Sequence, residues 1–248
     1  MTDARLAARL AVSAGKLLLE LRATPGLTGK ELGARGDAES NSYLLRELAT
    51  FRPGDAVLSE ESADSPARLT SRRVWIVDPL DGTREFAMPG RSDWAVHVAL
   101  WEAGRGITAA AVAQPALGAV YASDDVHAVH VARRRPVIVV SDSRPPGFAP
   151  AVAETVGADL LPMGSAGAKA MAVVRGDADA YLHAGGQWEW DSAAPVGVAA
   201  AAGLHTSRLS GARLQYNLPH PYLPDLLICR PELARPLIQA VINQNPRQ

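Results

Sequence analysis

Three short segments of the chain end in acidic side chains that could act together on one ligand. The first spans residues 74–83 and reads V-W-I-V-D-P-L-D-G-T. Its apolar start predicts a buried strand that ends on Asp78. Asp81 follows three residues later, close enough for both carboxylates to converge on one centre. Hard oxygen ligands of this kind point to a magnesium site.

The two residues after Asp81 suggest what lies beside that metal. Gly82 lets the backbone approach a ligand closely, and Thr83 adds a hydroxyl. A helix starting here would offer free N–H groups to an anion. The segment therefore predicts a phosphate held next to magnesium. By itself, the segment would more readily be an Asp-Pro and Asp-Gly surface turn with solvated acids.

The other two acidic segments lie far away in sequence. Residues 56–59 predict a short apolar strand that ends on Glu60 and Glu61. Carboxylates about 4 Å apart repel by roughly 4 kcal/mol at an intermediate dielectric, so a cation or solvent must separate them. The third segment is E-W-D at 189–191, which predicts a helix with Asp191 at its N-cap. A solvated loop and a plain N-cap are the alternatives.

Taken together, these segments resemble the signature of the inositol monophosphatase superfamily. That signature couples E-E, D-P-[IL]-D-G-T and a distant W-D-x-A in this order, and the resemblance covers nearly the whole chain. Asp37 also fits, because the family carries an acid on the helix before the glutamates.

Further details resemble one branch of the superfamily, the CysQ-type 3'(2'),5'-bisphosphate nucleotidases. They are R-E-F at 84–86, Q-P at 114–115, G-S-A-G-A-K at 164–169 and E-W-D at 189–191. The loop S-D-S-R at 141–144 is similar to the branch's S-x-S-H, but Arg144 stands where histidine is common.

The resemblance implies the fold and the metal site. The fold would be a layered αβαβα sandwich, α+β and then α/β, with the active site between the halves. One magnesium would be held by Glu60, Asp78 and the carbonyl of Leu80. A second would be held by Asp78, Asp81 and Asp191, and a third, weaker ion would lie near Glu60.

The resemblance also implies roles for single residues. Asp37 and Thr83 would orient the attacking water, with Glu60 as a further catalytic group. The residues expected to contact substrate are Glu60, Leu80, Asp81, Gly82, Thr83, Ser141, Ser143, Gly164, Ser165, Lys169 and Asp191. Lys169, one of only three lysines, would bind the remote part of the substrate, with an ordinary surface lysine as the alternative.

The substrate that the resemblance implies is 3'-phosphoadenosine 5'-phosphate, a by-product of sulfate assimilation, hydrolysed to AMP and phosphate. Inositol monophosphate and fructose 1,6-bisphosphate are the alternative substrates. A catalytically silent protein that binds a phosphorylated metabolite is an alternative of another class. Lithium inhibition and a homodimer are further implications.

The elements that must position these residues follow from apolar periodicity. Leucines at 6, 10, 17, 18 and 21 predict an opening amphipathic helix. A loop over 24–36 and a helix from near Asp37 to Pro53 should follow. Strands are then expected at 94–101, 107–113, 119–121 and 128–131, as an antiparallel meander.

The second half of the chain is expected to alternate strands and helices. Strands are predicted at 137–140, 180–182 and 225–229, and helices at 166–175, from 191, and at 233–242. The two halves, 1–134 and 135–248, should form one catalytic unit.

Composition narrows the function further. The chain has 248 residues and a formal net charge of −1, which does not favour binding to nucleic acid or to a membrane surface. Cys229 is the only cysteine, so no intrachain disulfide is expected. The six histidines lack metal-ligand spacing. The charged N-terminus is unlike a signal peptide, and the longest apolar tract, 193–204, is too short to span a bilayer. A cytoplasmic location is therefore expected.

Overall fold

The strands form two sheets of five strands each. The computed structural model describes residues 1–244. Its first sheet has the order β1-β2-β3-β4-β5 and is antiparallel except for the parallel pair β1-β2. The strands are β1 (Ala56–Ser59), β2 (Arg73–Asp81), β3 (Ala95–Glu102), β4 (Gly106–Gln114) and β5 (Ala119–Ala122).

The second sheet has the order β7-β6-β8-β10-β9. Strand β6 pairs in parallel with β7 and β8, and β10 pairs antiparallel with β8 and β9. The strands are β6 (Val137–Ser141), β7 (Asp159–Met163), β8 (Ala180–Trp188), β9 (His205–Ser207) and β10 (Tyr222–Cys229).

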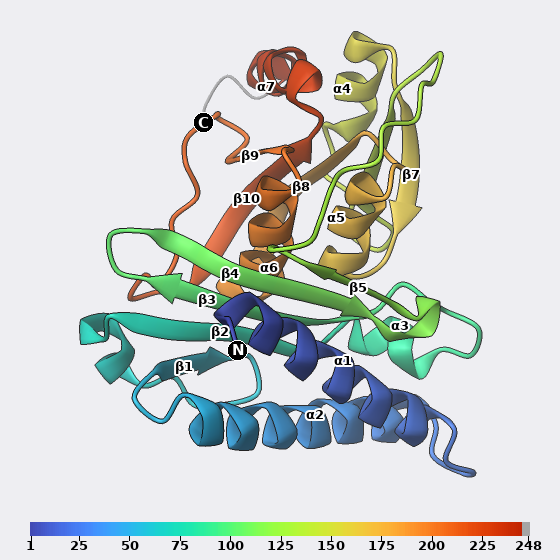
Figure 1. Ribbon diagram of the computed structural model, residues 1–248. Helices are drawn as coiled ribbons and strands as arrows, with labels where there is room; N and C mark the ends of the chain where they lie inside the picture. Colours follow the sequence, from blue (N-terminus) through green and yellow to red (C-terminus); the bar gives the residue numbers. More distant parts are fainter. Residues whose placement is uncertain (245–248) are drawn as a thin grey trace.

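Helices cover both sheets and fill the space between them, which gives the expected five αβαβα layers (Figure 1). The outer helices on the first sheet are α1 (Asp3–Arg22) and α2 (Gly29–Phe51). Between the sheets lie α5 (Ala166–Val174) and α6 (Glu189–Ala201), and α4 (Ala149–Val156) and α7 (Pro231–Gln244) cover the second sheet. The short α3 (Thr83–Ala87) follows β2, and single 3-10 turns occupy Pro66–Thr70 and Pro115–Leu117.

Strand β3 shows why the sequence folds into layers. Val96 and Val98 belong to the core under α1 and α2, whereas Ala95 and Ala99 belong to the core between the sheets. Alternate side chains of a strand point to opposite faces. Because both faces are covered by helices, the strand is apolar almost throughout.

The second helix starts earlier than predicted. It begins at Gly29 rather than near Asp37, so most of the predicted loop over 24–36 is helical. The glycines that suggested a loop are needed for close packing instead. A Cβ on Gly33 would lie 2.8 Å from Cγ2 of Thr83, and one on Gly36 would lie 2.9 Å from Leu80. The helix therefore packs directly on the D-P-L-D-G-T segment.

Other predictions about the elements were wrong or incomplete. Residues 128–131 are not a strand; instead, the Val129 N–H donates to the carbonyl of Val174 at 2.8 Å. The elements α4, β7 and β9 were not predicted. Strand β7 has a proline and two exposed residues, which is typical of an edge strand and gives a weak pattern.

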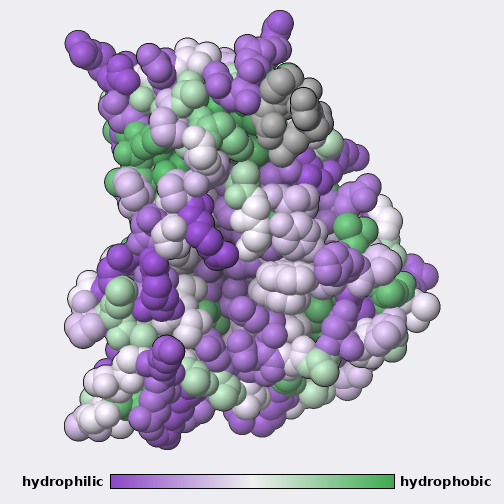
Figure 2. All heavy atoms as spheres, turned by 180° about the vertical axis from the view of Figure 1, so that it is seen from behind, coloured by the Kyte–Doolittle hydropathy of each residue, from purple (hydrophilic) through white to green (hydrophobic). Residues whose placement is uncertain are grey.

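The molecular surface is mixed in character. Figure 2 shows hydrophilic residues across the middle of the face behind that of Figure 1, with a group of hydrophobic residues above them. Among residues 1–244, no helix combines the length and apolar character needed to cross a membrane.

Candidate active site

Three carboxylates from both halves of the chain converge at the boundary between the two sheets. Asp78 and Asp81 come from the end of β2, and Asp191 comes from the first turn of α6. Each offers one oxygen, and these oxygens all lie within 4.8 Å of one another. The sequence predicted this convergence, and the geometry confirms it.

The electrostatics of this cluster suit a divalent cation. Burial, followed by repulsion from Glu60 and Asp81, raises the pKa of Asp78 well above its ordinary value. Burial and the charge of Asp81 raise the pKa of Asp191 to about 7. Buried acids that repel one another in this way are stabilised as anions by a bound metal, and carboxylate oxygens are the ligands that magnesium prefers.

Asp81 differs from its two neighbours because it is already surrounded by donors. It accepts hydrogen bonds from the Ser165 hydroxyl and from the N–H groups of Ala166 (3.0 Å) and Gly167 (2.6 Å). Burial alone would raise its pKa, but His97, the Ser165 hydroxyl and the charge of Lys169 outweigh burial and lower it to about 2. Asp81 therefore stays anionic and joins the first sheet to the start of α5.

His97 is a residue of the site that the sequence did not reveal. It is fully buried on β3, and its Nε2 lies 3.2 Å from Oδ2 of Asp81. Its Nδ1 donates to the carbonyl of Trp190 at 3.1 Å. A Cβ on Gly167 would lie 2.1 Å from that Nε2, so only glycine lets α5 approach so closely. Because the partners of His97 lie far from it in sequence, no spacing of residues around His97 could have identified it as part of the site.

The position of Asp191 in its helix corrects the prediction. The N-cap of α6 is Trp188, and Asp191 occupies the third helical position. Its Oδ2 accepts the Trp188 N–H at 2.6 Å, as in a capping box. This bond leaves the other carboxylate oxygen free of the helix.

The two remaining predicted acids lie beside the cluster. Glu60 follows β1 and is not one of the three converging carboxylates. Glu60 is an exposed residue, but partial removal from water and repulsion from Asp191 and Glu61 raise its pKa to about 8. Asp37 lies on α2 and accepts the Thr83 hydroxyl at 3.1 Å. Burial and the charge of Glu61 raise the pKa of Asp37 to about 6.

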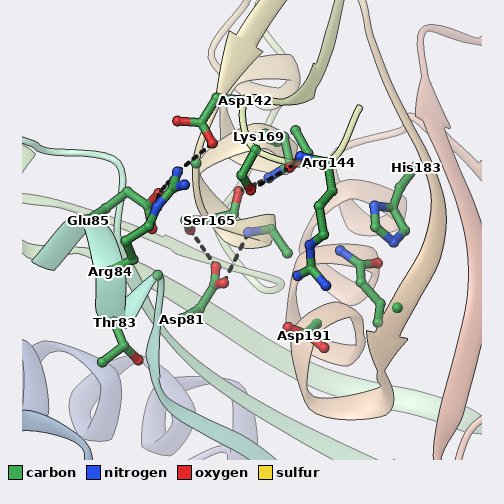
Figure 3. Close-up of a pocket in the computed structure, with 17 residues that line it drawn as sticks. Asp81, Thr83, Arg84, Glu85, Asp142, Arg144, Ser165, Lys169, His183 and Asp191 are labelled. Carbon is green, nitrogen blue, oxygen red and sulfur yellow. Dashed lines mark hydrogen bonds and ion pairs between the residues drawn. The ribbon is translucent and has the colours of Figure 1, made fainter. Parts of the chain in front are cut away.

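A pocket of about 260 Å³ opens beside the carboxylates and is lined by both halves of the chain (Figure 3). Nine predicted residues line it: Asp81, Gly82, Thr83, Ser141, Ser143, Gly164, Ser165, Lys169 and Asp191. Residues not predicted as contacts also line it: Arg84, Glu85, Asp142, Arg144, Ala166, His183, Gly186 and Gln187. The predicted residues Asp37, Glu60, Asp78 and Leu80 are outside the lining.

Lys169 is neither a surface lysine nor a free cation. It is only 4% exposed, and burial lowers its pKa. Its Nζ donates to the carbonyl of Ser165 at 2.6 Å and lies 5.3 Å from the centre of the Tyr181 ring. The interpretation as an ordinary surface residue is therefore wrong, and at least one of its three donors holds the turn before α5.

The wall of the pocket formed by the loop after β6 and by β8 is polar and cationic. In Figure 3 the Arg144 side chain extends from the loop after β6 into the pocket, toward Asp191. Two buried polar atoms of this wall, Nε2 of His183 and Oε1 of Gln187, have no hydrogen-bond partner among the described residues. Burial and the nearby cations of Lys169 and Arg144 lower the pKa of His183 to about 4. This wall can therefore bind a polar or anionic group.

Comparison with known proteins agrees with this geometry. The model of the inositol monophosphatase family matches residues 4–144 and 137–244. The chain belongs to the inositol monophosphatase family. The 3'-phosphoadenosine 5'-phosphate phosphatase of Mycobacterium leprae is 54% identical over 98% of this chain and 94% of that protein. The 3'(2'),5'-bisphosphate nucleotidase CysQ of Salmonella typhimurium is 30% identical over 75% of this chain and 80% of that protein.

Solved structures of the inositol monophosphatase family share the fold. Inositol monophosphatase II of Staphylococcus aureus superposes with a TM-score of 0.79 at 20% identity, covering 96% of this chain and 92% of that chain. An inositol monophosphatase of Zymomonas mobilis gives a TM-score of 0.77 at 22% identity, covering 96% of both chains. The family and its layered fold are thus as the sequence predicted.

Proposed function

We propose that this protein is a magnesium-dependent phosphatase that hydrolyses 3'-phosphoadenosine 5'-phosphate to AMP and phosphate. The observation that carries this proposal is a single pocket lined both by carboxylates of the acidic cluster, Asp81 and Asp191, and by the cationic side chain of Arg144. A bisphosphate could place one phosphate on the metal and the other against Arg144. The name of the 54% identical relative supports the same substrate.

The carboxylates give the proposed metal ligands. Glu60, Asp78 and the carbonyl of Leu80 would hold one magnesium, and Asp78, Asp81 and Asp191 a second, with a third, weaker ion near Glu60. Bound magnesium supplies a Lewis acid for the phosphoryl oxygens and lowers the pKa of a bound water. Asp81 would bind through an oxygen that still has a free lone pair, because Oδ1 accepts only the Ala166 N–H among the described residues.

Asp37 and Thr83 would orient the attacking water. When the Thr83 hydroxyl donates to Asp37, the Thr83 oxygen can still accept a hydrogen bond from a water molecule. The oxygen of this water would then face the phosphorus. A bond would form between the water oxygen and phosphorus as the bond between phosphorus and the 3' oxygen breaks, and a proton would pass to the 3' oxygen as it leaves. The N–H groups of Gly82 and Thr83, with Ser165, would contact the phosphoryl oxygens.

The wall formed by the loop after β6 and by β8 would recognise the rest of the substrate. Arg144 would pair with the 5'-phosphate, assisted by the hydroxyls of Ser141 and Ser143. The unpartnered nitrogen of His183 and oxygen of Gln187 offer further polar contacts. Lys169 would contribute through the turn that it holds and through any donor left free. Inositol monophosphate lacks a second phosphate and would leave this wall unused.

A comparison of kcat/KM on three substrates tests the proposal. With magnesium, we expect 3'-phosphoadenosine 5'-phosphate to be preferred over inositol 1-phosphate and fructose 1,6-bisphosphate. In Arg144→Ala the efficiency on the nucleotide should fall by about 10-fold or more, the value of one charge-assisted hydrogen bond. Arg134→Ala, an exposed arginine outside the pocket, is the matched control.

Several outcomes would favour the alternatives. A wild-type preference for inositol 1-phosphate or fructose 1,6-bisphosphate would replace the proposed substrate. Binding without turnover of any of the three would favour a silent binding protein. Inhibition by lithium chloride beyond that by potassium chloride, and a dimer in sedimentation experiments, are further expectations of the proposal.

A further inference from the structure

An ion-pair network crosses the rim of the pocket, and the proposed chemistry does not use it. Asp142, which directly follows β6, accepts Arg84 Nη2 at 2.5 Å on Oδ1 and Arg91 Nη2 at 3.0 Å on Oδ2. Figure 3 shows Arg84 between Glu85 and Asp142. Both arginines belong to the first half of the chain, so the carboxylate of Asp142 joins the two halves.

A second contact between the halves starts from Arg91. Its Nε donates to Asp93 at 2.6 Å, and Asp93 in turn accepts the Gly164 N–H at 2.7 Å. The Arg91 carbonyl accepts Nη1 of Arg22 on α1 at 2.8 Å. Arg91 is thus anchored to the first half of the chain while it holds two segments of the second half.

Both of those segments line the pocket. Asp142 and Gly164 are themselves lining residues, and the Asp142 N–H donates to the carbonyl of Met163 at 3.1 Å. A Cβ on Gly164 would lie 2.5 Å from the Glu85 side chain, so no space separates the halves here. A shift of Asp142 would therefore move the pocket wall directly.

The segment that Asp142 anchors carries Arg144, the cation that extends into the pocket. The Arg144 N–H donates to the Ser141 hydroxyl at 3.2 Å, which makes residues 141–144 a compact turn. The side chain of Asp142 is 21% exposed and that of Arg91 34% exposed, so solvent screens the pair only in part. Through Asp142, the turn is thus attached by two ion pairs to the half that carries Asp78 and Asp81.

We propose that Asp142 is a positioning residue that sets the distance between the metal-binding carboxylates and the turn bearing Arg144. A substrate with two anionic groups must match that distance, whereas a substrate with one phosphate need not. Asp142 would therefore determine selectivity for bisphosphates without contacting the reacting atoms. This inference rests on the proposed function.

The test compares Asp142→Asn with Asp142→Glu, which keeps the charge. Asp159→Asn is the matched control, because Asp159 pairs with Arg135 at 2.9 Å at the opposite end of the paired strands β6 and β7. For Asp142→Asn, we expect KM for 3'-phosphoadenosine 5'-phosphate to rise about 5-fold or more, with kcat changed less than about 2-fold. Kinetics on inositol 1-phosphate should stay within about 2-fold of wild type, and Asp142→Glu should recover most of the lost KM.

Hydrogen exchange of residues 139–147 gives a second readout that needs no substrate. Exchange should be faster in Asp142→Asn and unchanged in Asp159→Asn. Unchanged exchange, or an equal loss on both substrates, would overturn the positioning role. Faster exchange with unchanged selectivity would overturn the role in specificity. A wild-type protein that does not hydrolyse the bisphosphate would overturn the proposed function, and the exchange data would still decide whether Asp142 fixes the turn.

Discussion

At the scale of single residues, Asp191 gives the clearest test of the metal site. Asp191→Asn keeps the shape and the acceptor for the Trp188 N–H but removes the charge next to Asp78 and Asp81. We expect kcat to fall by about 100-fold or more, since even the supports of metal ligands contribute 10- to 100-fold. Turnover at saturating magnesium, with circular dichroism as the check on folding, measures this effect. Near-normal turnover would remove Asp191 from the ligand set.

Lys169 leads to a different expectation at the same scale. Lys169→Met fills the volume but leaves the Ser165 carbonyl without its 2.6 Å donor. The carbonyl would keep only the backbone N–H of residue 169, at 3.3 Å, and the loss of the hydrogen bond from the charged amine should lower the free energy of unfolding by about 1–3 kcal/mol. Urea denaturation measures that loss, and Lys30→Met on exposed surface is the control. If stability is unchanged while only nucleotide binding weakens, Lys169 acts on the substrate and not on the turn.

At the scale of elements, the contact between β3 and the start of α5 is the sensitive point. Gly167→Ala would place a methyl group 2.1 Å from Nε2 of His97, so the helix must move away from Asp81. Overpacking of this kind costs about 1–3 kcal/mol, and the moved helix would also lower turnover. The free energy of unfolding, measured by denaturation, and kcat should both fall. Gly147→Ala, which meets nothing within 4 Å, should change neither, and a silent Gly167→Ala would contradict this packing.

At the scale of the whole molecule, magnesium should stabilise the fold, and more so at higher pH. Without metal, the pKa values of Asp191 (about 7) and Glu60 (about 8) lie above their unfolded values near 4. The folded protein then holds protons that the unfolded chain has lost, so stability falls as pH rises from about 4 to 8. The acids with lowered pKa values, such as Asp3 and Asp93, add stability that is lost only at more acidic pH.

Thermal melts in EDTA and in magnesium across that pH range measure this linkage. We expect the melting temperature in EDTA to fall as pH rises. Magnesium at about 100 times its Kd should raise it by about 5–10 °C near pH 8 and by less near pH 6. Asp191→Asn should reduce both effects. A melting temperature in EDTA that rises over this range would contradict the electrostatics of the cluster.

The sequence by itself determined the family, the layers and the acids of the site. Asp78 and Asp81 follow an apolar strand within one continuous motif, and the periodicity of α1 and β3 is local, so both can be identified without tertiary structure. Because such predictions depend on local patterns, elements whose patterns are weak, such as the edge strand β7, were missed.

The tertiary structure alone decided what surrounds those acids. His97 reaches Asp81 from the adjacent strand, and Asp142 meets Arg84 across 58 residues of chain. The glycines of α2 suggested a loop, but the packing of that helix on Thr83 and Leu80 requires them. Such contacts depend on how separate elements pack in space, and no spacing along one segment encodes them. The sequence therefore predicts the acids that we propose bind metal, whereas the packing determines which residues hold those acids and shape the pocket.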